Sequence, residues 1–219
     1  MAGLAAVAAV ALWVVLGWPD VAALALKNPD TTAFFEAAKA RGNDVEWRWV
    51  PYARISFELK KAVVAAEDLS FFSHHGFDTH ELKVAARDAV QGRRVRGAST
   101  ITQQLAKNLW LSPSRSPMRK LREVVLTRQL ERHLSKQRIL ELYLNVAQFG
   151  PETFGAEAAA HRYFGISAGA LDADQAAQLA AALPRPTTWH PGVSSRGYLQ
   201  AVSRVRARAE QSDWLDQLL

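Results

Sequence analysis

The chain has 219 residues, a formal net charge of +6 at pH 7 and no cysteine. Hydrophobic residues make up 49% of it, which excludes a largely disordered chain, and the lack of cysteine excludes disulfides, a thiol nucleophile and a cysteine–zinc site. A chain of this length can bury one substantial core, so we expect one folded domain.

The apolar N-terminus is the first predicted element. Residues 2–18 contain no charge, and as a helix they would span roughly 25 Å, the short end of what crosses a hydrocarbon core of ~30 Å. We therefore predict a transmembrane anchor over residues 1–18 and a juxtamembrane segment over residues 19–44. A cleaved signal peptide is the alternative, because the sequence ALA at 23–25 resembles a cleavage site, although no basic segment precedes the apolar run.

The rest of the chain carries mostly helical signals. Thr31 or Thr32 can cap a short helix that stops at Gly42, whereas residues 45–52 alternate apolar and polar side chains as an extended segment does. Four further N-cap signals precede helical runs, at Ser56, Ser116, Ser135 and Asp172. A basic amphipathic helix is predicted over residues 195–217.

The helix after Ser116 has a predicted inner face and a strong charge. Its apolar residues Met118, Leu121 and Val125 are expected to face inward. Residues 113–138 hold eight Arg and Lys residues against two Glu, so this window carries a charge of +6. Such a field suits phosphate, nucleic acid or an anionic membrane surface.

Two carboxylates end the helix that follows Ser56. Glu67 and Asp68 stand before the sequence LSFFSHHGFD. The negative end of the helix dipole and desolvation by aromatic neighbours both raise the pKa of such a carboxylate, which suits a general base or acid near neutral pH. The alternative is a pair of ordinary surface acids. We expect His74 to be a hydrogen-bonded scaffold residue and Gly76 to form a turn with positive φ.

Residues 96–108, RGASTITQQLAKN, combine hydroxyls and amides with no carboxylate. In a helix, Gln104 and Asn108 share a face. Neutral amides and hydroxyls suit sugar hydroxyls and N-acetyl groups, whereas Lys107 and Arg115 suit phosphate oxygens. A solvated polar helix face is the alternative. The spacing is not that of a P-loop, so it does not indicate nucleotide binding.

A second carboxylate follows in Arg119-Lys120-x-x-Glu123. Arg119 and Glu123 are four residues apart and can pair on one helix face. Taken alone, this spacing is more often an ordinary ion pair than a site. Near Lys107 and Arg115, the pair can instead direct the Arg119 cation toward a bound anion and hold Glu123 close by as a second carboxylate.

Five segments, in this order, resemble the five signature motifs of the peptidoglycan glycosyltransferases of glycosyltransferase family 51. They are Glu67-Asp68-x-x-Phe71-x-x-His74-x-Gly76-x-Asp78, Gly97 to Asn108, Arg119-Lys120-x-x-Glu123, Lys136-x-x-Ile139-Leu140-Glu141-x-Tyr143-Leu144-Asn145, and Gly155 to Gly165. The chain stops where a bifunctional penicillin-binding protein continues into a transpeptidase domain, so we expect a monofunctional member.

The resemblance implies a mostly α, lysozyme-like fold with two lobes around a substrate groove, behind one N-terminal transmembrane helix. The glycosyltransferase domain is then residues 45–219. The implied reaction polymerises lipid II into β-1,4-linked glycan and releases undecaprenyl pyrophosphate, by an inverting, general-base mechanism. The implied location is the bacterial inner membrane, crossed once, with the catalytic domain on the periplasmic side.

The resemblance also assigns roles to residues. Glu67 becomes the general base, and Glu123 becomes a second catalytic carboxylate that orders donor-side groups. The implied substrate-binding residues are Asp68, Ser99, Gln104, Lys107, Asn108, Arg115, Arg119 and Lys120. Lys107 and Arg115 are expected to stabilise the departing pyrophosphate. No cofactor is required by the sequence, which allows Mg²⁺ or Mn²⁺ at the pyrophosphate.

The implied partners are lipid II, lipid-linked glycan, the membrane, and other cell-wall synthases or divisome proteins. Three rival functions remain open. A lytic hydrolase shares the fold and the glutamate but needs no pyrophosphate site. A non-catalytic scaffold for cell-wall assembly does not need Glu67. A nucleic-acid binder is suggested by the basic window, but the chain shows no basic-aromatic platform and we expect no nucleic acid partner.

Overall fold

The computed structural model describes residues 17–78, 83–84, 87, 91, 99–112 and 116–219. Within these residues it is mostly helical, with one sheet of two short strands. Most of the predicted anchor, residues 1–16, lies outside the described part. In the part that is described, no helix is long and apolar enough to cross a membrane.

The helices and strands are as follows. The α-helices are α2 (Ala33–Lys39), α3 (Phe57–Glu67), α5 (Ile101–Trp110), α6 (Pro117–His133), α7 (Lys136–Val146), α8 (Ala156–Phe164), α9 (Ala173–Ala182) and α10 (Arg196–Glu210). The 3₁₀ helices are η1 (Ala22–Ala25), η2 (Tyr52–Arg54), η3 (Ala168–Ala170) and η4 (Asp213–Gln217). Strands β1 (Glu46–Trp47) and β2 (Thr153–Phe154) are parallel, with Glu46 opposite Thr153.

The predicted helix starts are confirmed. At each one a side-chain oxygen accepts a hydrogen bond from the backbone amide three residues later, which satisfies an amide that has no partner inside the helix. The capping residues are Thr32, Ser56, Ser116, Ser135 and Asp172. These caps fix where α2, α3, α6, α7 and α9 begin.

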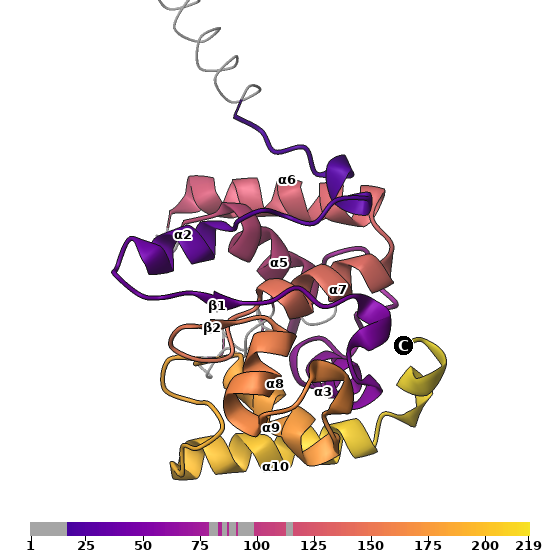
Figure 1. Cartoon of the computed structure of the whole chain (residues 1–219). Coiled ribbons are helices and arrows are strands. Elements are labelled where there is room, and N and C mark those ends of the chain that lie inside the picture. Colours follow the sequence, from indigo (N-terminus) through magenta and orange to yellow (C-terminus); the bar gives the residue numbers. More distant parts are fainter. Residues whose placement is uncertain (1–16, 79–82, 85–86, 88–90, 92–98, 113–115) are drawn as a thin grey trace, which may run out of the picture.

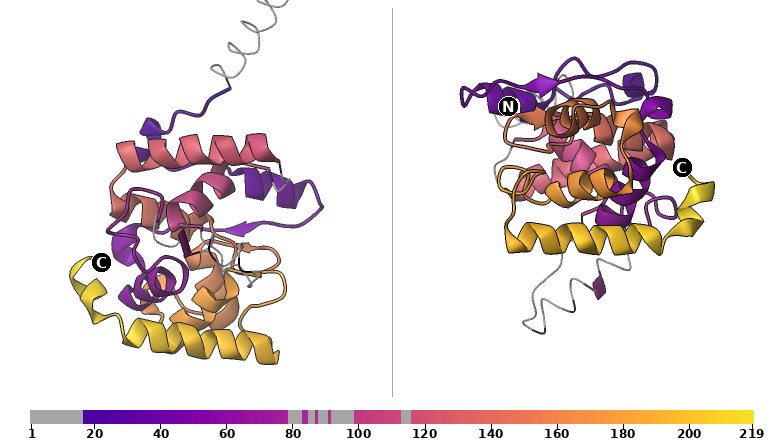
Figure 2. Two further views of the ribbon diagram at one scale, coloured as in Figure 1. Left: turned by 180° about the vertical axis from the view of Figure 1, so that it is seen from behind. Right: turned by 60° about the horizontal axis from the view of Figure 1, so that its bottom comes forward.

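The helices pack in two groups around one hydrophobic core. Helix α5 packs against α6, α7 and α2, whereas α3 packs against α9 and α10. Figure 1 shows α6 along one edge of the molecule and α10 along the opposite edge, and the view from behind in Figure 2 agrees. The segment 19–44 joins the same core through buried residues Val21, Leu24, Phe35 and Ala38.

Side chains of helix α7 bind the backbone of the segment that precedes α3. The Asn145 amide bonds both backbone groups of Val50, at 2.8 and 2.9 Å, and Glu141 accepts from the backbone amide of Tyr52 at 3.1 Å. The predicted extended segment 45–52 is therefore held mainly by side chains of α7. Only Glu46–Trp47 pairs as a strand.

The predicted inner face of α6 is wrong. Met118, Leu121 and Val125 are 66%, 57% and 39% exposed. The buried residues of α6 are Glu123, Leu126, Thr127 and Leu130. Their spacing is that of one helix face, but this face contains a carboxylate that is buried because two cations pair with it. A pattern of apolar residues alone therefore selects the neighbouring face.

The predicted C-terminal helix is shorter than expected. Helix α10 ends at Glu210, and the chain continues into η4 instead of one helix to residue 217. Ser212, just after the end of α10, is buried, and its hydroxyl donates to the carbonyl oxygen of Arg208 at 2.7 Å. This bond satisfies one of the last carbonyls of α10 and lets the chain turn.

Candidate active site

Glu67 is the last residue of α3 and is half-buried. Its Oε2 accepts a hydrogen bond of 2.7 Å from Nε2 of Gln104 on α5. Burial raises the pKa of the Glu67 carboxyl, and the neighbouring charge of Asp68 acts in the same direction. The Gln104 hydrogen bond and the cations Lys107 and Arg208 lower this pKa without cancelling the rise. Such a carboxylate is a better proton acceptor than an exposed one.

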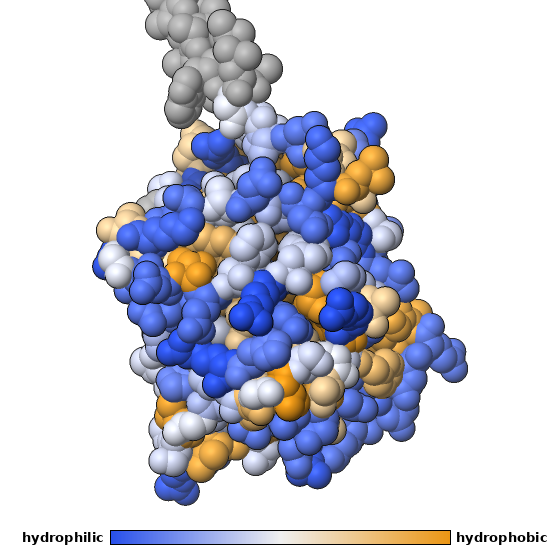
Figure 3. All heavy atoms as spheres, in the orientation of Figure 1, coloured by the Kyte–Doolittle hydropathy of each residue, from blue (hydrophilic) through white to orange (hydrophobic). Residues whose placement is uncertain are grey.

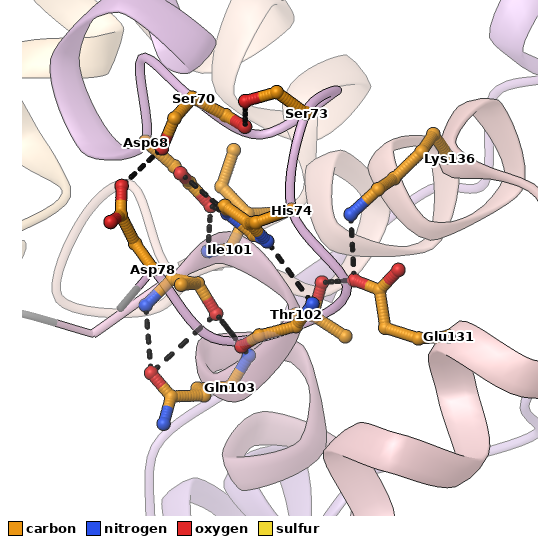
Figure 4. A network of polar contacts seen from close by, with 12 residues as sticks. Asp68, Ser70, Ser73, His74, Asp78, Ile101, Thr102, Gln103, Glu131 and Lys136 are labelled. Carbon is orange, nitrogen blue, oxygen red and sulfur yellow. Dashed lines mark hydrogen bonds and ion pairs between the residues drawn. The ribbon is translucent and has the colours of Figure 1, made fainter. Parts of the chain in front are cut away.

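Asp68, the next residue, is buried and joins three segments (Figure 4). Its two oxygens lie 2.9 and 3.0 Å from Nε2 of His74, and Oδ2 accepts from the backbone amide of Ile101 at 3.0 Å. The Gly76 amide donates to Nδ1 of His74, so in the neutral ring Nε2 carries the proton and donates to Asp68. The scaffold role predicted for His74 is confirmed.

Gly76 has the predicted positive φ, at +87°. A Cβ atom here would lie 2.7 Å from Cγ2 of Thr127, so the turn also needs glycine for close packing against α6. The Gly76 carbonyl accepts from the Thr100 hydroxyl at 2.8 Å. The loop after Asp68 is thereby fixed to the first turn of α5.

Three side chains of the polar motif at the start of α5 make structural hydrogen bonds. Thr100 and Gln103 form a reciprocal capping box. Thr102 donates to Glu131 on α6 at 2.5 Å, and Lys136 donates to the same oxygen at 2.8 Å (Figure 4). These three motif side chains therefore hold α5 in place. Gln104 and Lys107 do not take part in these bonds and lie half-buried on α5.

Lys107 is half-buried one turn after Gln104. Its Nζ lies 5.3 Å from the ring centroid of Phe34 and has no hydrogen-bond acceptor among the residues that the structure describes. Burial lowers the pKa of Lys107, the charges of Arg119 and Lys120 act in the same direction, and Glu123 and Glu67 oppose them. The Lys107 ammonium is thus placed among the charges of the predicted site.

Glu123 on α6 is only 3% exposed. Its Oε2 accepts from Nη1 of Arg119 at 3.0 Å, and its Oε1 accepts from Nζ of Lys120. The predicted pairing of Arg119 with Glu123 is confirmed. Both carboxylate oxygens are occupied by cations, so Glu123 orders these two side chains.

The other predicted substrate-binding residues are Ser99, Asn108 and Arg115, and the first two differ in exposure. Ser99 is exposed at the start of the described motif, and Asn108 is buried with no hydrogen bond to a described residue. Arg115 lies outside the described residues. In the described part of the chain, no group of three or more His, Asp or Glu residues could hold a metal ion. With both Glu123 oxygens paired as well, these residues do not fit a protein-held metal.

A comparison with protein families gives one match. The family described as "Transglycosylase" matches residues 35–211. The chain belongs to this transglycosylase family. The matched range includes all the candidate residues above, from Glu67 to Arg208.

Curated relatives agree with this assignment. All three compared are named biosynthetic peptidoglycan transglycosylase. The relative from Azoarcus sp. is 47% identical over 212 residues, which cover 94% of this chain and 91% of the relative. The one from Thiobacillus denitrificans is 47% identical over 205 residues, 89% and 86% of the two chains. The one from Alcanivorax borkumensis is 53% identical over 163 residues, 74% and 66%. This transglycosylase is therefore an enzyme, a glycosyltransferase of peptidoglycan synthesis.

Two residues of the site are not among the sequence candidates. The Tyr143 hydroxyl on α7 donates to Oε1 of Gln104 at 2.8 Å. Arg208 on α10 donates to the carbonyls of Ala65 and Ala66, at the end of α3, at 3.4 Å each. Tyr143 belongs to the fourth motif, yet its spacing also fits an ordinary core residue. Nothing in the local sequence of Arg208 marks it.

Proposed function

We propose that this transglycosylase polymerises lipid II into β-1,4-linked glycan, with inversion at the anomeric carbon and release of undecaprenyl pyrophosphate. The observation that carries the proposal is that two half-buried groups, Glu67 at the end of α3 and Lys107 on α5, are near enough for each charge to act on the other. Glu67 has a raised pKa and a fixed hydrogen bond, and Lys107 is a cation with no acceptor among the described residues. One can take a proton, and the other can bind developing negative charge.

In the proposed reaction, Glu67 removes the proton from the 4-hydroxyl of the acceptor sugar. The freed oxygen attacks the anomeric carbon of the lipid-linked donor chain. The bond from this carbon to the pyrophosphate oxygen breaks, and the bonding electrons leave with the pyrophosphate. A single displacement inverts the anomeric configuration, so no covalent glycosyl-enzyme and no second nucleophile is needed.

Lys107 is the proposed partner of the departing pyrophosphate. An ammonium with no acceptor among the described residues, in a partly desolvated site, stabilises phosphate oxygens more strongly than an exposed lysine does. We assign Arg115, Ser99 and Asn108 as further substrate contacts on the strength of the motif. Asp68 and Gln104 are proposed to act by holding Glu67 and α5 in place, because their bonds are to protein groups.

Glu123 is proposed to order the donor side of the site. Its two oxygens hold Arg119 and Lys120 beside Lys107, which gathers positive charge where the pyrophosphate leaves. Both oxygens of Glu123 are already paired to cations, so neither is left open toward a substrate. This supports an organising role in place of a direct attack.

The exposed stripe of α6 is proposed to face the membrane. Met118, Leu121 and Val125 lie on the same helix as the exposed cations Lys120 and Arg128. Apolar and basic residues together suit the surface of an anionic bilayer. Figure 3 shows apolar and hydrophilic residues side by side along the upper edge, over α6 and η1, with further apolar groups lower on the same face. The stripe would bring the site to its lipid-linked substrate.

We further propose the two-lobed, lysozyme-like arrangement, an anchor over residues 1–18, and a catalytic domain over residues 45–219 outside the bacterial inner membrane. The division of the helices into an α5–α6–α7 group and an α3–α9–α10 group supports two lobes. Association with other cell-wall synthases or divisome proteins stays a prediction.

The test is incubation of the full chain with fluorescent lipid II in detergent, followed by separation of the products. The proposal expects long glycan and one undecaprenyl pyrophosphate for each bond formed. Digestion of the polymer with a muramidase to disaccharide units confirms the β-1,4 linkage. Cleavage of existing glycan without net polymerisation would identify a lytic enzyme. No reaction, under conditions in which an established synthase works, would favour a scaffold.

A further inference from the structure

Three buried or half-buried side chains form a line that ends at Glu67. The Tyr143 hydroxyl on α7 donates to Oε1 of Gln104 at 2.8 Å, and Nε2 of Gln104 donates to Oε2 of Glu67 at 2.7 Å. Tyr143 is 1% exposed and packs in the hydrophobic core. The line therefore connects a rigid part of α7 to the carboxylate at the end of α3.

The two ends of the Gln104 amide are not equivalent. Its oxygen only accepts hydrogen bonds and its nitrogen only donates them. Since Tyr143 donates to the oxygen, the nitrogen must face Glu67 and can bond the ionised carboxylate. If the amide rotated by half a turn, its oxygen would face the carboxylate oxygens. The Tyr143 proton would then lose its acceptor, and no other described residue bonds this hydroxyl.

We propose that Tyr143 is a positioning residue that holds the Gln104 amide as a hydrogen-bond donor to Glu67 and so keeps this carboxylate available as a base. The inference rests on the proposed function of Glu67. It assigns to Tyr143 a part in the reaction that is separate from its packing in the core. Tyr143 itself does not touch the reacting atoms in this account.

The charges around Glu67 show why one hydrogen bond matters. Burial and Asp68 raise the pKa of Glu67, whereas the Gln104 bond is the largest influence that lowers it, ahead of Lys107 on α5 and Arg208 on α10. Helix α9, which also packs against α3, turns alanine and leucine residues inward. Burial together with Glu67 and Asp68 raises the pKa of Tyr143 well above its usual range, so Tyr143 stays protonated as a donor.

The test is the pH profile of kcat/KM for lipid II polymerisation by Tyr143→Phe. Without the hydroxyl, the amide can turn its oxygen toward Glu67, which favours the protonated acid. The acidic limb of the profile should move to higher pH by about one unit, the size expected for loss of one hydrogen bond to a carboxylate. At pH values above this limb, the rate should recover to within a few-fold of wild type.

Tyr198→Phe is the matched control. Tyr198 is also 1% exposed, and its hydroxyl donates to the carbonyl of Gln178 at 2.9 Å, so this variant loses a buried hydrogen bond of the same kind. Tyr198→Phe should lower the free energy of unfolding by a similar amount and leave the acidic limb of the pH profile at its wild-type position. A second variant, Gln104→Leu, should move the limb as far as Tyr143→Phe does. Combining the two substitutions should move it no further.

An acidic limb that stays in place in folded Tyr143→Phe overturns the inference, and so does a limb that moves equally in Tyr198→Phe. If Tyr143→Phe does not fold, the Gln104→Leu variant decides. An acidic limb of its pH profile at the wild-type position also overturns the inference. Failure of the underlying proposal looks different. In that case Glu67→Gln polymerises lipid II at the wild-type rate, whatever Tyr143→Phe does.

Discussion

The backbone amide of Ile101 donates a hydrogen bond to Oδ2 of Asp68 across 3.0 Å. Asp68 follows the proposed base, Glu67, and Ile101 is the first residue of the helix that carries Gln104 and Lys107. This bond ties the end of α3 to the start of α5, which belong to different packing groups. It therefore sets the distance between the proton acceptor and the proposed pyrophosphate cation.

Asp68→Asn should weaken this junction. Both oxygens of Asp68 lie within 3.0 Å of the Nε2 donor of His74, so the amide nitrogen that replaces either oxygen sets a donor against a donor and removes the charged acceptor. We expect the free energy of unfolding to fall by about 1.5–3 kcal/mol, the usual range for a hydrogen bond to a buried charged group. Urea unfolding measures it, with the exposed Asp30→Asn as control. Equal losses of unfolding free energy in both variants would show that the Asp68 bonds do not stabilise the contact between α3 and α5.

Lys107→Met should abolish most polymerisation without harming the fold. Loss of one group that stabilises transition-state charge typically costs about 10²–10³ in kcat. Burial lowers the pKa of Lys107, so the charged form is disfavoured by folding and its removal should not lower the melting temperature. Lys39→Met, at an exposed lysine, serves as the control. Wild-type turnover by Lys107→Met would exclude Lys107 from the pyrophosphate site.

Glu67→Gln should stabilise the protein near neutral pH and not in acid. The pKa of Glu67 is raised above its ordinary 4.5, so folding favours the protonated form. Below pH 4.5 the acid is protonated in both folded and unfolded chains; as the pH rises through the folded pKa, ionisation costs stability. Glutamine avoids this cost, with a gain of about 1 kcal/mol, typical for relief of an active-site compromise.

Melting temperatures of wild type and Glu67→Gln between pH 4 and pH 8 measure this effect. The difference should grow with pH. Glu58→Gln, on the first turn of the same helix, subtracts the general effect of losing a carboxylate. A difference that is constant over this pH range would show that Glu67 is not disfavoured as an anion.

The α6 stripe can be mapped because the chain has no cysteine. A fluorophore that is sensitive to polarity, attached to Leu121→Cys in the full chain in lipid nanodiscs, should report an apolar environment with several-fold brighter emission. The same label at Leu199→Cys, an exposed site on α10 at the opposite edge, should report water. Equal, water-like emission from both sites would argue against membrane contact by α6.

The sequence predicted the starts of the helices well because these depend on local chemistry. Ser56, Ser116 and Ser135 each bond an amide three residues away, so a short stretch of sequence contains the whole interaction. The positive φ of Gly76 is local in the same way. The catalytic candidates were found through motif resemblance, and in the structure the charges of Glu67 and Glu123 both act to raise the pKa of Lys107.

The errors have two kinds of cause: local pairs that occupy polar side chains within one helix, and tertiary contacts between distant residues. Glu123 is buried because Arg119 and Lys120 neutralise it, so α6 turns inward a face that looks polar. Thr100 and Gln103, which look like sugar ligands, are used to cap α5. The Tyr143 bond to Gln104 joins residues 39 positions apart, and no local pattern contains it.

The most direct test of the central claim is polymerisation of labelled lipid II by the full chain carrying Glu67→Gln, beside wild type and Glu58→Gln. Circular dichroism confirms that each variant is folded. The account predicts long glycan from wild type and Glu58→Gln, and no polymer from folded Glu67→Gln. Polymer from Glu67→Gln at the wild-type rate would contradict Glu67 as the base, even if the chain is a peptidoglycan glycosyltransferase.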